Sequence, residues 1–278
     1  MKMINANGAS IPGIGLGTWT LKDEEATRLV AHALDAGYRH IDTAAMYANE
    51  KAVGAGLRAS GVPREEIFVT TKVWYTDIAD GDLQQSAEAS LERLDIDDVD
   101  LMLIHWPSAD VPLADSIRAL NEVQEYGLAR SIGVSNFPVA LLERAISMSD
   151  NPLVCNQVEY HPFLDQSAVL RACRAHGMAV VSYCPLCRGS ELFEQAAVRS
   201  AANKYNRTPA QIVLRWHVQQ DSVAAIPRSR TPARIIENLN VFNFELTADE
   251  MAAISALRDR NKRICQFDFG PSWDPPEL

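Results

Sequence analysis

The feature of this sequence that most constrains its fold is a regular alternation between short apolar runs and amphipathic stretches. Eight such runs cover residues 14–16, 40–42, 67–72, 99–105, 131–134, 154–158, 178–183 and 223–226. They lack polar alternation, which is typical of strands covered on both faces in a parallel sheet. Between them apolar residues recur at helical spacing, as in Ala26, Leu29, Val30, Ala33 and Leu34. Eight strand-then-helix units predict an α/β fold, a single (β/α)8 TIM barrel.

All 278 residues are expected to form one domain. The length suits a single barrel of about 250 residues, and no internal repeat, low-complexity tract or linker interrupts residues 1–278. The Asn7-Gly8 pair predicts the turn of an N-terminal hairpin that closes the bottom of the barrel. Extra C-terminal helices are expected around 209–219 and 247–257, the second beginning at a capping box of Thr247 and Glu250.

Charge and composition exclude several function classes. The formal net charge of −10 argues against a nucleic-acid partner, which requires basic residues clustered over a wide face. No apolar run approaches the ~18 residues of a membrane span, and residues 1–5 do not resemble an export signal, so we expect no membrane partner. The five cysteines are odd in number and scattered, which favours a reducing cytoplasm and offers no set of four metal ligands.

Two short motifs match patterns whose usual functions we do not assign here. Residues 54–59 fit the relaxed dinucleotide fingerprint G-x-G-x-x-[GA], but they lie inside a helical pattern that spans 49–60. The fingerprint binds pyrophosphate only in the turn between a strand and a helix, so we predict that the chain is not a Rossmann protein. Cys184 and Cys187 form a lone C-x-x-C pair, which we interpret as two ordinary thiols, with oxidative sensitivity as the alternative.

The ends of the predicted strands carry the residues that suggest chemistry, because barrel active sites lie at the C-terminal ends of the strands. Asp42, Tyr47, Lys72 and His105 follow three consecutive strands and should be neighbours at the barrel mouth. Each alone could cap, pack or be solvated, but together they indicate carbonyl reduction with Tyr47 as the general acid. A free tyrosine has a pKa of about 10, which the ammonium of Lys72 would lower. Asp42 would keep Lys72 charged, and His105 would position the carbonyl oxygen.

The sequence resembles the aldo-keto reductases from about Pro12 to Asn238. Three motifs in order carry the resemblance: GYRHIDTA at 37–44 with Glu50 and Gly54, RSIGVSNF at 130–137, and IPRS at 226–229 with Arg234, Glu237 and Asn238. HWP at 105–107 and NQVE at 156–159 also fit. The compact loops are similar to those of the bacterial branch that acts on 2,5-diketo-gluconate and methylglyoxal. The resemblance implies that Asp42, Tyr47, Lys72 and His105 are the catalytic tetrad.

The resemblance also implies NADPH/NADP+ as the cofactor, extended across the barrel mouth. Ser135, Asn136 and Gln157 would then bind the carboxamide, and Tyr183 would stack on the nicotinamide ring. Arg228, Ser229 and Arg234 would hold the 2′-phosphate, with Glu237 and Asn238 near the adenine, because arginine matches a phosphate bidentately. Relatives often have lysine at the position of Arg228. The remaining residues expected at the cofactor are Gly17, Thr18, Asp42, Pro185, Leu186 and Ile226.

The substrate pocket is expected to be shallow and open. The loop after His105 and the tail after Leu257 are both short, which favours small aldehydes, ketones and dicarbonyls, with methylglyoxal as a first test. We expect such a small molecule to be the partner and the chain to be a monomer. The expected walls are Trp19, Met46, Tyr47, Trp74, His105 and Trp106.

Two alternative functions use the same residues. An NADPH-binding sensor or channel-associated subunit on this fold would bind the cofactor with little turnover, and the intact set of four residues argues against it. A Schiff-base aldolase would use Lys72 as its nucleophile. That lysine would need a pKa depressed by burial or by a neighbouring cation, whereas an aspartate neighbour has the reverse effect.

Overall fold

Eight parallel strands form a closed barrel in the computed structural model, which describes residues 2–189 and 191–276. The strands follow the chain order around the sheet, and each coincides with a predicted run. Leu16 and Gly17 of the first strand lie beside the last, where the Gly15 amide donates to the carbonyl of Ala225 (2.9 Å). The strands are β3 (Leu16–Gly17), β4 (His40–Asp42), β5 (Phe68–Val73), β6 (Val99–Ile104), β7 (Ala129–Ser135), β8 (Leu153–Glu159), β9 (Ala179–Tyr183) and β10 (Val223–Ala225).

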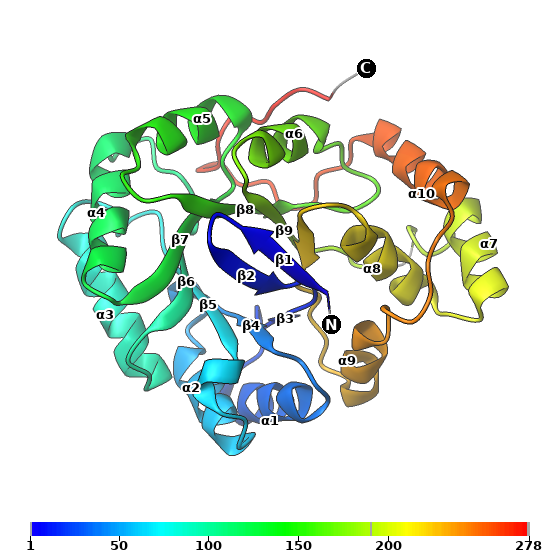
Figure 1. The fold of residues 1–278 in the computed structure, drawn as a ribbon, viewed down its shortest axis with the longest axis horizontal. Helices are drawn as coiled ribbons and strands as arrows, with labels where there is room; N and C mark the ends of the chain where they lie inside the picture. The colour runs from blue at the N-terminus through cyan, green and yellow to red at the C-terminus, as the bar shows by residue number, and fades with distance from the viewer. Residues whose placement is uncertain (1, 190, 277–278) are drawn as a thin grey trace.

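Helices surround this barrel (Figure 1). They are α1 (Asp23–Asp35), α2 (Glu50–Ala59), α3 (Asp82–Leu94), α4 (Leu113–Glu125), α5 (Val139–Met148), α6 (Ser167–Ala175), α7 (Ala196–Tyr205), α8 (Pro209–Gln219), α9 (Pro232–Leu239) and α10 (Ala248–Ser255), with short 3-10 turns η1 (Ala45–Tyr47), η2 (Arg64–Glu66) and η3 (Ala256–Arg260). The predicted apolar face of α1 is buried. No helix in these described parts of the chain is both long and apolar enough to cross a membrane.

Two helices connect β9 to β10, and they correct one expectation. The sequence placed an extra helix at 209–219, but α8 packs against β10 and therefore occupies the barrel-helix position. The extra helix is α7, which lies outside α8 and also contacts α10 (Figure 1). The predicted capping box at the start of α10 is confirmed, with the Glu250 amide donating to the Thr247 hydroxyl (3.3 Å).

The N-terminal hairpin closes the bottom of the barrel, as predicted. Strands β1 (Met3–Ala6) and β2 (Ala9–Pro12) pair antiparallel, and the hairpin covers the barrel centre in Figure 1. Ile4 and Ile11 are buried in one cluster with side chains of the barrel interior. The Asn7 amide donates to the carbonyl of Leu153 at the start of β8 (2.8 Å). The hairpin therefore leaves open the opposite end of the barrel, where the strands have their C-terminal ends and where barrel active sites lie.

The glycines of the relaxed fingerprint lie inside α2, as expected. A Cβ added to Gly54 would lie 2.0 Å from the carbonyl oxygen of Leu94, and one added to Gly56 would lie 2.7 Å from the Cβ of Val30. These two glycines therefore allow α2 to approach α1 and the end of α3 closely.

Candidate active site

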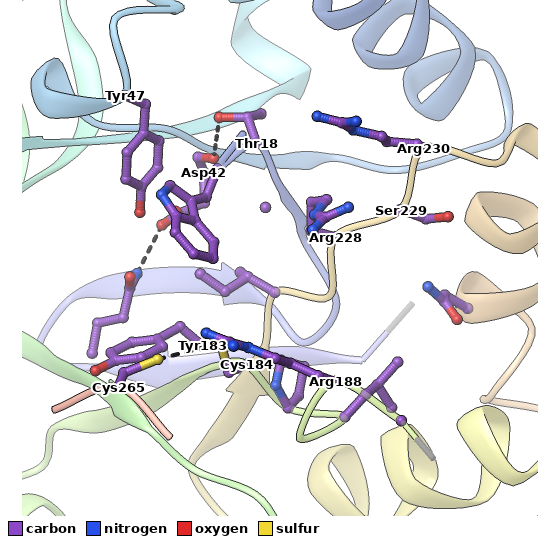
Figure 2. A pocket seen from close by; sticks show the side chains of 18 of the residues that line it. Thr18, Asp42, Tyr47, Tyr183, Cys184, Arg188, Arg228, Ser229, Arg230 and Cys265 are labelled. Carbon is purple, nitrogen blue, oxygen red and sulfur yellow. Dashed lines mark hydrogen bonds between the residues drawn. The ribbon is translucent and has the colours of Figure 1, made fainter. Parts of the chain in front are cut away.

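A cavity of about 980 Å³ opens at the C-terminal ends of the strands. Every residue predicted to contact substrate lines it, as do all the predicted cofactor residues except Ser135. Figure 2 shows Tyr47, Asp42 and Tyr183 toward one end, with Tyr183 on the wall opposite Tyr47, and Arg228, Ser229 and Arg230 toward the other end. The predicted residues in the wall are Gly17, Thr18, Trp19, Asp42, Met46, Tyr47, Trp74, His105, Trp106, Asn136, Gln157, Tyr183, Pro185, Leu186, Ile226, Arg228, Ser229, Arg234, Glu237 and Asn238.

A buried ion pair lies beneath the cavity at the Tyr47 end, and of its two residues only Asp42 lines the cavity. The Nζ of Lys72 lies 2.5 Å from Oδ1 of Asp42 and donates to the carbonyl of Thr43 (2.7 Å). Lys72 is fully buried and Asp42 is 1% exposed. The second carboxylate oxygen of Asp42 accepts from the Gln157 amide (2.7 Å). Because β4, β5 and β8 supply these groups, the closed barrel fixes their positions.

Tyr47 and His105 lie above this pair. The ring centroid of Tyr47 is 5.1 Å from Nζ of Lys72 and 5.5 Å from the ring centroid of His105. Tyr47 ends the short η1 turn directly after β4, and His105 directly follows β6. The structure thus brings together the four residues that the sequence predicted would meet.

The acidity of Tyr47 differs from the sequence-based expectation. Lys72 was expected to lower the pKa of the phenol, but the pKa is raised well above its usual value. Burial of the phenol is the main cause, followed by the negative charge of Asp42 and then by Cys184 and Cys265. The ammonium of Lys72 is bound by Asp42, so its charge is largely neutralised. Tyr47 is therefore a protonated phenol across the neutral range.

The other two titratable groups are shifted by the same burial. Burial lowers the pKa of Lys72, and the adjacent Asp42 opposes this shift. Burial, with a contribution from Lys72, lowers the pKa of His105 well below its usual value. His105 is therefore a neutral imidazole near pH 7, and its Nδ1 has no hydrogen-bond partner among the described residues.

The three predicted carboxamide ligands differ in what they can reach. Ser135 lies behind the wall, where its hydroxyl donates to the carbonyl of Gln157 (2.8 Å). Asn136 lines the cavity, but its amide donates to the carbonyl of His105 (3.0 Å) and its oxygen accepts from the Tyr183 hydroxyl (2.7 Å). Asn136 therefore orients Tyr183 and the start of the loop after β6. Sequence spacing could not separate this positioning contact from a ligand contact.

The far end of the cavity is basic. Arg228 and Arg234 are exposed side chains in its wall, and no described residue pairs with either guanidinium. Arg230 differs, because it donates to the carbonyl of Thr20 (2.8 Å) and lies 3.5 Å from Glu25. Arg188, from the loop after β9, also lines the cavity and was not predicted (Figure 2). Two unpaired guanidinium groups suit a phosphate.

The C-terminal tail adds residues to the cavity wall that the sequence did not predict. Cys265, Phe267 and Phe269 line the cavity. The Phe269 ring lies 5.5 Å from both Trp74 and Trp106, so the tail adds an aromatic wall over the mouth. The tail is held to the barrel by Glu159 at the end of β8. The carboxylate of Glu159 accepts hydrogen bonds from the backbone amides of Ile264 and Cys265, which lie more than a hundred residues further along the chain. The sequence signal was the repeated phenylalanine at 267 and 269, with Trp273 close behind, in a tail that begins with many charged residues.

Comparisons with known proteins agree with this geometry. Residues 13–259 match the sequence model of the Aldo/keto reductase family. An aldo-keto reductase of Mycobacterium sp. (strain MCS) is 48% identical, with 90% of this chain and 88% of the relative covered. Methylglyoxal reductase DkgA of Yersinia pestis is 44% identical, with 93% and 92% covered. The crystal structure of a Bombyx mori aldo-keto reductase in complex with NADP has a TM-score of 0.89 at 35% identity, with 97% of each chain covered.

Proposed function

The chain belongs to the aldo/keto reductase family, and from this premise we propose that it reduces small aldehydes, ketones and dicarbonyls to alcohols with NADPH. The observation that carries the proposal is the meeting of Tyr47 and His105 above the buried Lys72–Asp42 pair, at the wall of a large cavity. Relatives named methylglyoxal reductase and glyoxal reductase support the substrate class.

The donor groups of the cavity suit NADPH. Arg228 and Arg234 are cations without protein partners among the described residues, as a 2′-phosphate would require. Tyr183 offers a ring along the wall whose hydroxyl is held by Asn136 (2.7 Å), a suitable surface for stacking. When bound, the cofactor supplies the hydride.

The chain's own residues supply the proton and the orientation. Tyr47 keeps its proton because its pKa is raised by burial, and it donates that proton to the substrate oxygen as negative charge develops there. Neutral His105 donates a hydrogen bond to the same oxygen. Lys72 and Asp42 bind each other beneath the phenol, with Nζ of Lys72 5.1 Å from the ring centroid, and this buried pair fixes the base on which Tyr47 rests.

The pocket walls favour compact substrates with an apolar or planar group. Trp19, Trp74 and Trp106 line the substrate end, and Met46 is 43% exposed beside them. Phe267 and Phe269 add to this wall. Dicarbonyls such as methylglyoxal are small enough to pass between the rings, and a 2,5-diketo-gluconate-like acid is a further candidate.

The aldolase alternative is disfavoured by the position of Lys72. Its ammonium is fully buried, is bound to Asp42 and Thr43, and does not line the cavity. A Schiff base requires that the amine reach the substrate carbonyl. A sensor without turnover would bind NADPH equally well. A measurement of carbonyl reduction must therefore decide between a sensor and a reductase.

NADPH consumption across a carbonyl panel, with Tyr47→Phe alongside the wild type, tests the proposal. The variant removes the acid but preserves the shape, so we expect turnover to fall by about 10²–10⁴-fold while NADPH binding, measured by quenching of protein fluorescence, is retained. Tyr126→Phe is the matched control, because Tyr126 is 64% exposed and does not line the cavity. Wild-type binding of NADPH without consumption of any carbonyl would favour the sensor and defeat the proposal.

A further inference from the structure

Two cysteines from distant parts of the chain meet in the wall of the cavity. Cys184 directly follows β9, and Cys265 lies in the C-terminal tail. Their sulfur atoms are 3.7 Å apart, and both residues line the cavity, as Figure 2 shows. The sequence pattern suggested Cys187 as the neighbour of Cys184, but Cys187 is buried and does not line the cavity.

The backbone on both sides of this pair is held in place. The carboxylate of Glu159 accepts the amides of Ile264 and Cys265, both at 2.7 Å, and is itself fully buried. Cys184 has a φ of +48°, a left-handed conformation that is uncommon for a residue other than glycine. A disulfide needs a sulfur–sulfur distance of about 2.05 Å. Because the sulfurs are already 3.7 Å apart, the bond requires them to close by less than about 2 Å.

Cys184 is also the one thiol of the five whose pKa is lowered, whereas the pKa values of the other four are raised. Its contact with Cys265 lowers the pKa of Cys184, burial opposes this, and the nearby Arg188 and Arg228 lower it further. Burial instead raises the pKa of Cys173 to about 12 and that of Cys187 to about 11. Because the thiolate is the nucleophile, an oxidant that enters the cavity meets Cys184 as its preferred target.

We propose that Cys184 and Cys265 form a reversible disulfide in response to hydroperoxides, and that this bond slows the enzyme by pinning the tail to the loop after β9. The sulfur of Cys184 attacks the peroxide, whose O–O bond breaks to leave a sulfenic acid and an alcohol or water. Cys265 then attacks the sulfenic sulfur, its proton leaves with the hydroxide as water, and the S–S bond forms. One hydroperoxide is reduced while two thiols are oxidised.

The effect on turnover rests on the proposed function, whereas the disulfide itself does not. Cys184 is next to Tyr183, which we place against the nicotinamide, and Cys265 is two residues from Phe267 in the aromatic wall. Drawing the two sulfurs together moves the ring, the wall or both. Misplacement by about 1 Å can reduce catalysis about a hundredfold. In a reducing cytoplasm such a bond is transient, as is usual for redox-sensing pairs.

Peptide mapping of the reduced protein after exposure to hydrogen peroxide tests the pairing directly. We expect a crosslinked peptide that contains Cys184 and Cys265, its loss after dithiothreitol, and slower formation when NADP+ is bound in the cavity. Turnover should fall at least about tenfold and recover with the reductant. A map without this crosslink, or one that joins Cys184 to Cys187, overturns the proposal whether or not any carbonyl is reduced.

Cysteine variants distinguish inhibition by the Cys184–Cys265 disulfide from general oxidative damage. The activity of each variant after peroxide is compared with the activity of the same variant before treatment. Cys184→Ser and Cys265→Ser should each lose the reversible inhibition, because neither retains a partner. Cys187→Ser and Cys173→Ser should respond like the wild type. Equal peroxide sensitivity in all four variants would overturn the proposal. If no variant reduces any carbonyl, the crosslink and its effect on NADPH affinity still decide it.

Discussion

At the Tyr47 end of the cavity the charged side chains of Lys72 and Asp42 are buried and bound to other protein groups, whereas at the other end Arg228 and Arg234 face solvent. Lys72 and Asp42 are at most 1% exposed and bind each other, Thr43 and Gln157. Arg228 and Arg234 are exposed, and no described residue pairs with them. The two ends belong to one cavity. They differ in how deeply their charged side chains are buried and in whether those side chains bind other protein groups.

The contrast teaches that the two ends depend on the fold in different ways. A buried charge must be compensated inside the protein. At the Tyr47 end the strand ends supply both partners of the ion pair, so the loss of one partner should change the stability of the fold. An exposed guanidinium costs little when it is unpaired, and it can await an anion. Substitutions at the first end should therefore alter folding as well as activity, and those at the second should alter only binding.

The largest effect is expected from Lys72→Met. This change leaves the Asp42 carboxylate buried without its cation, which typically destabilises a protein by about 3–5 kcal/mol. Urea denaturation monitored by tryptophan fluorescence would measure the loss of unfolding free energy. Arg228→Ala is the control and should stay within about 0.5 kcal/mol of the wild type. Similar losses for both variants would erase the contrast between the two ends.

The next effect concerns cofactor affinity at the basic end. Arg234→Ala removes a charged donor from the proposed 2′-phosphate site, which is worth about 1.5–3 kcal/mol, or a loss of roughly 10–150-fold in NADPH affinity. NADH lacks this phosphate, so its affinity should barely change. Titration of both cofactors against wild type and variant measures the difference. Parallel losses for the two cofactors would show that Arg234 does not contact the phosphate.

A smaller effect is expected from the protonation of His105 at the buried end. Because the pKa of His105 is lowered, the unfolded chain binds a proton below about pH 6.5 that the folded protein does not. Stability should therefore decrease as the pH falls through this region, by up to about 1.4 kcal/mol per pH unit for this group. Denaturation at several pH values should give a shallower slope for His105→Gln and an unchanged slope for Arg234→Ala. An unchanged slope in both variants would contradict the assignment.

The smallest effect is expected from Arg230→Ala. Arg230 stands in the same cluster as Arg234 but already binds Thr20 and lies near Glu25. Its removal should weaken NADPH binding by no more than about 1 kcal/mol. Comparing its titration with that of Arg234→Ala shows whether pairing within the protein, rather than position in the sequence, decides which arginine holds the phosphate.

Local patterns were sufficient for the barrel and for the meeting of the tetrad. Each strand appears as an apolar run, and in a parallel barrel the residues that follow consecutive strands must be neighbours. The same reasoning was less successful for Ser135, which is the last residue of β7 and does not line the cavity. It also gave no sign of the contact of Cys184 with Cys265, because spacing along the chain draws attention only to Cys187 and folding alone brings the sulfur of Cys265 within 3.7 Å.

By itself, the sequence determined which strands form, their order, and which side chains stand at the mouth, because periodicity and chain order are local properties. The tertiary structure alone decided the acidity of Tyr47, the place of Phe267 and Phe269 in the cavity wall, and the contact of Cys184 with Cys265. Burial and contacts between residues distant in sequence depend on how the whole chain packs. For this reason burial and long-range contacts cannot be read from the residues that surround a single position in the sequence.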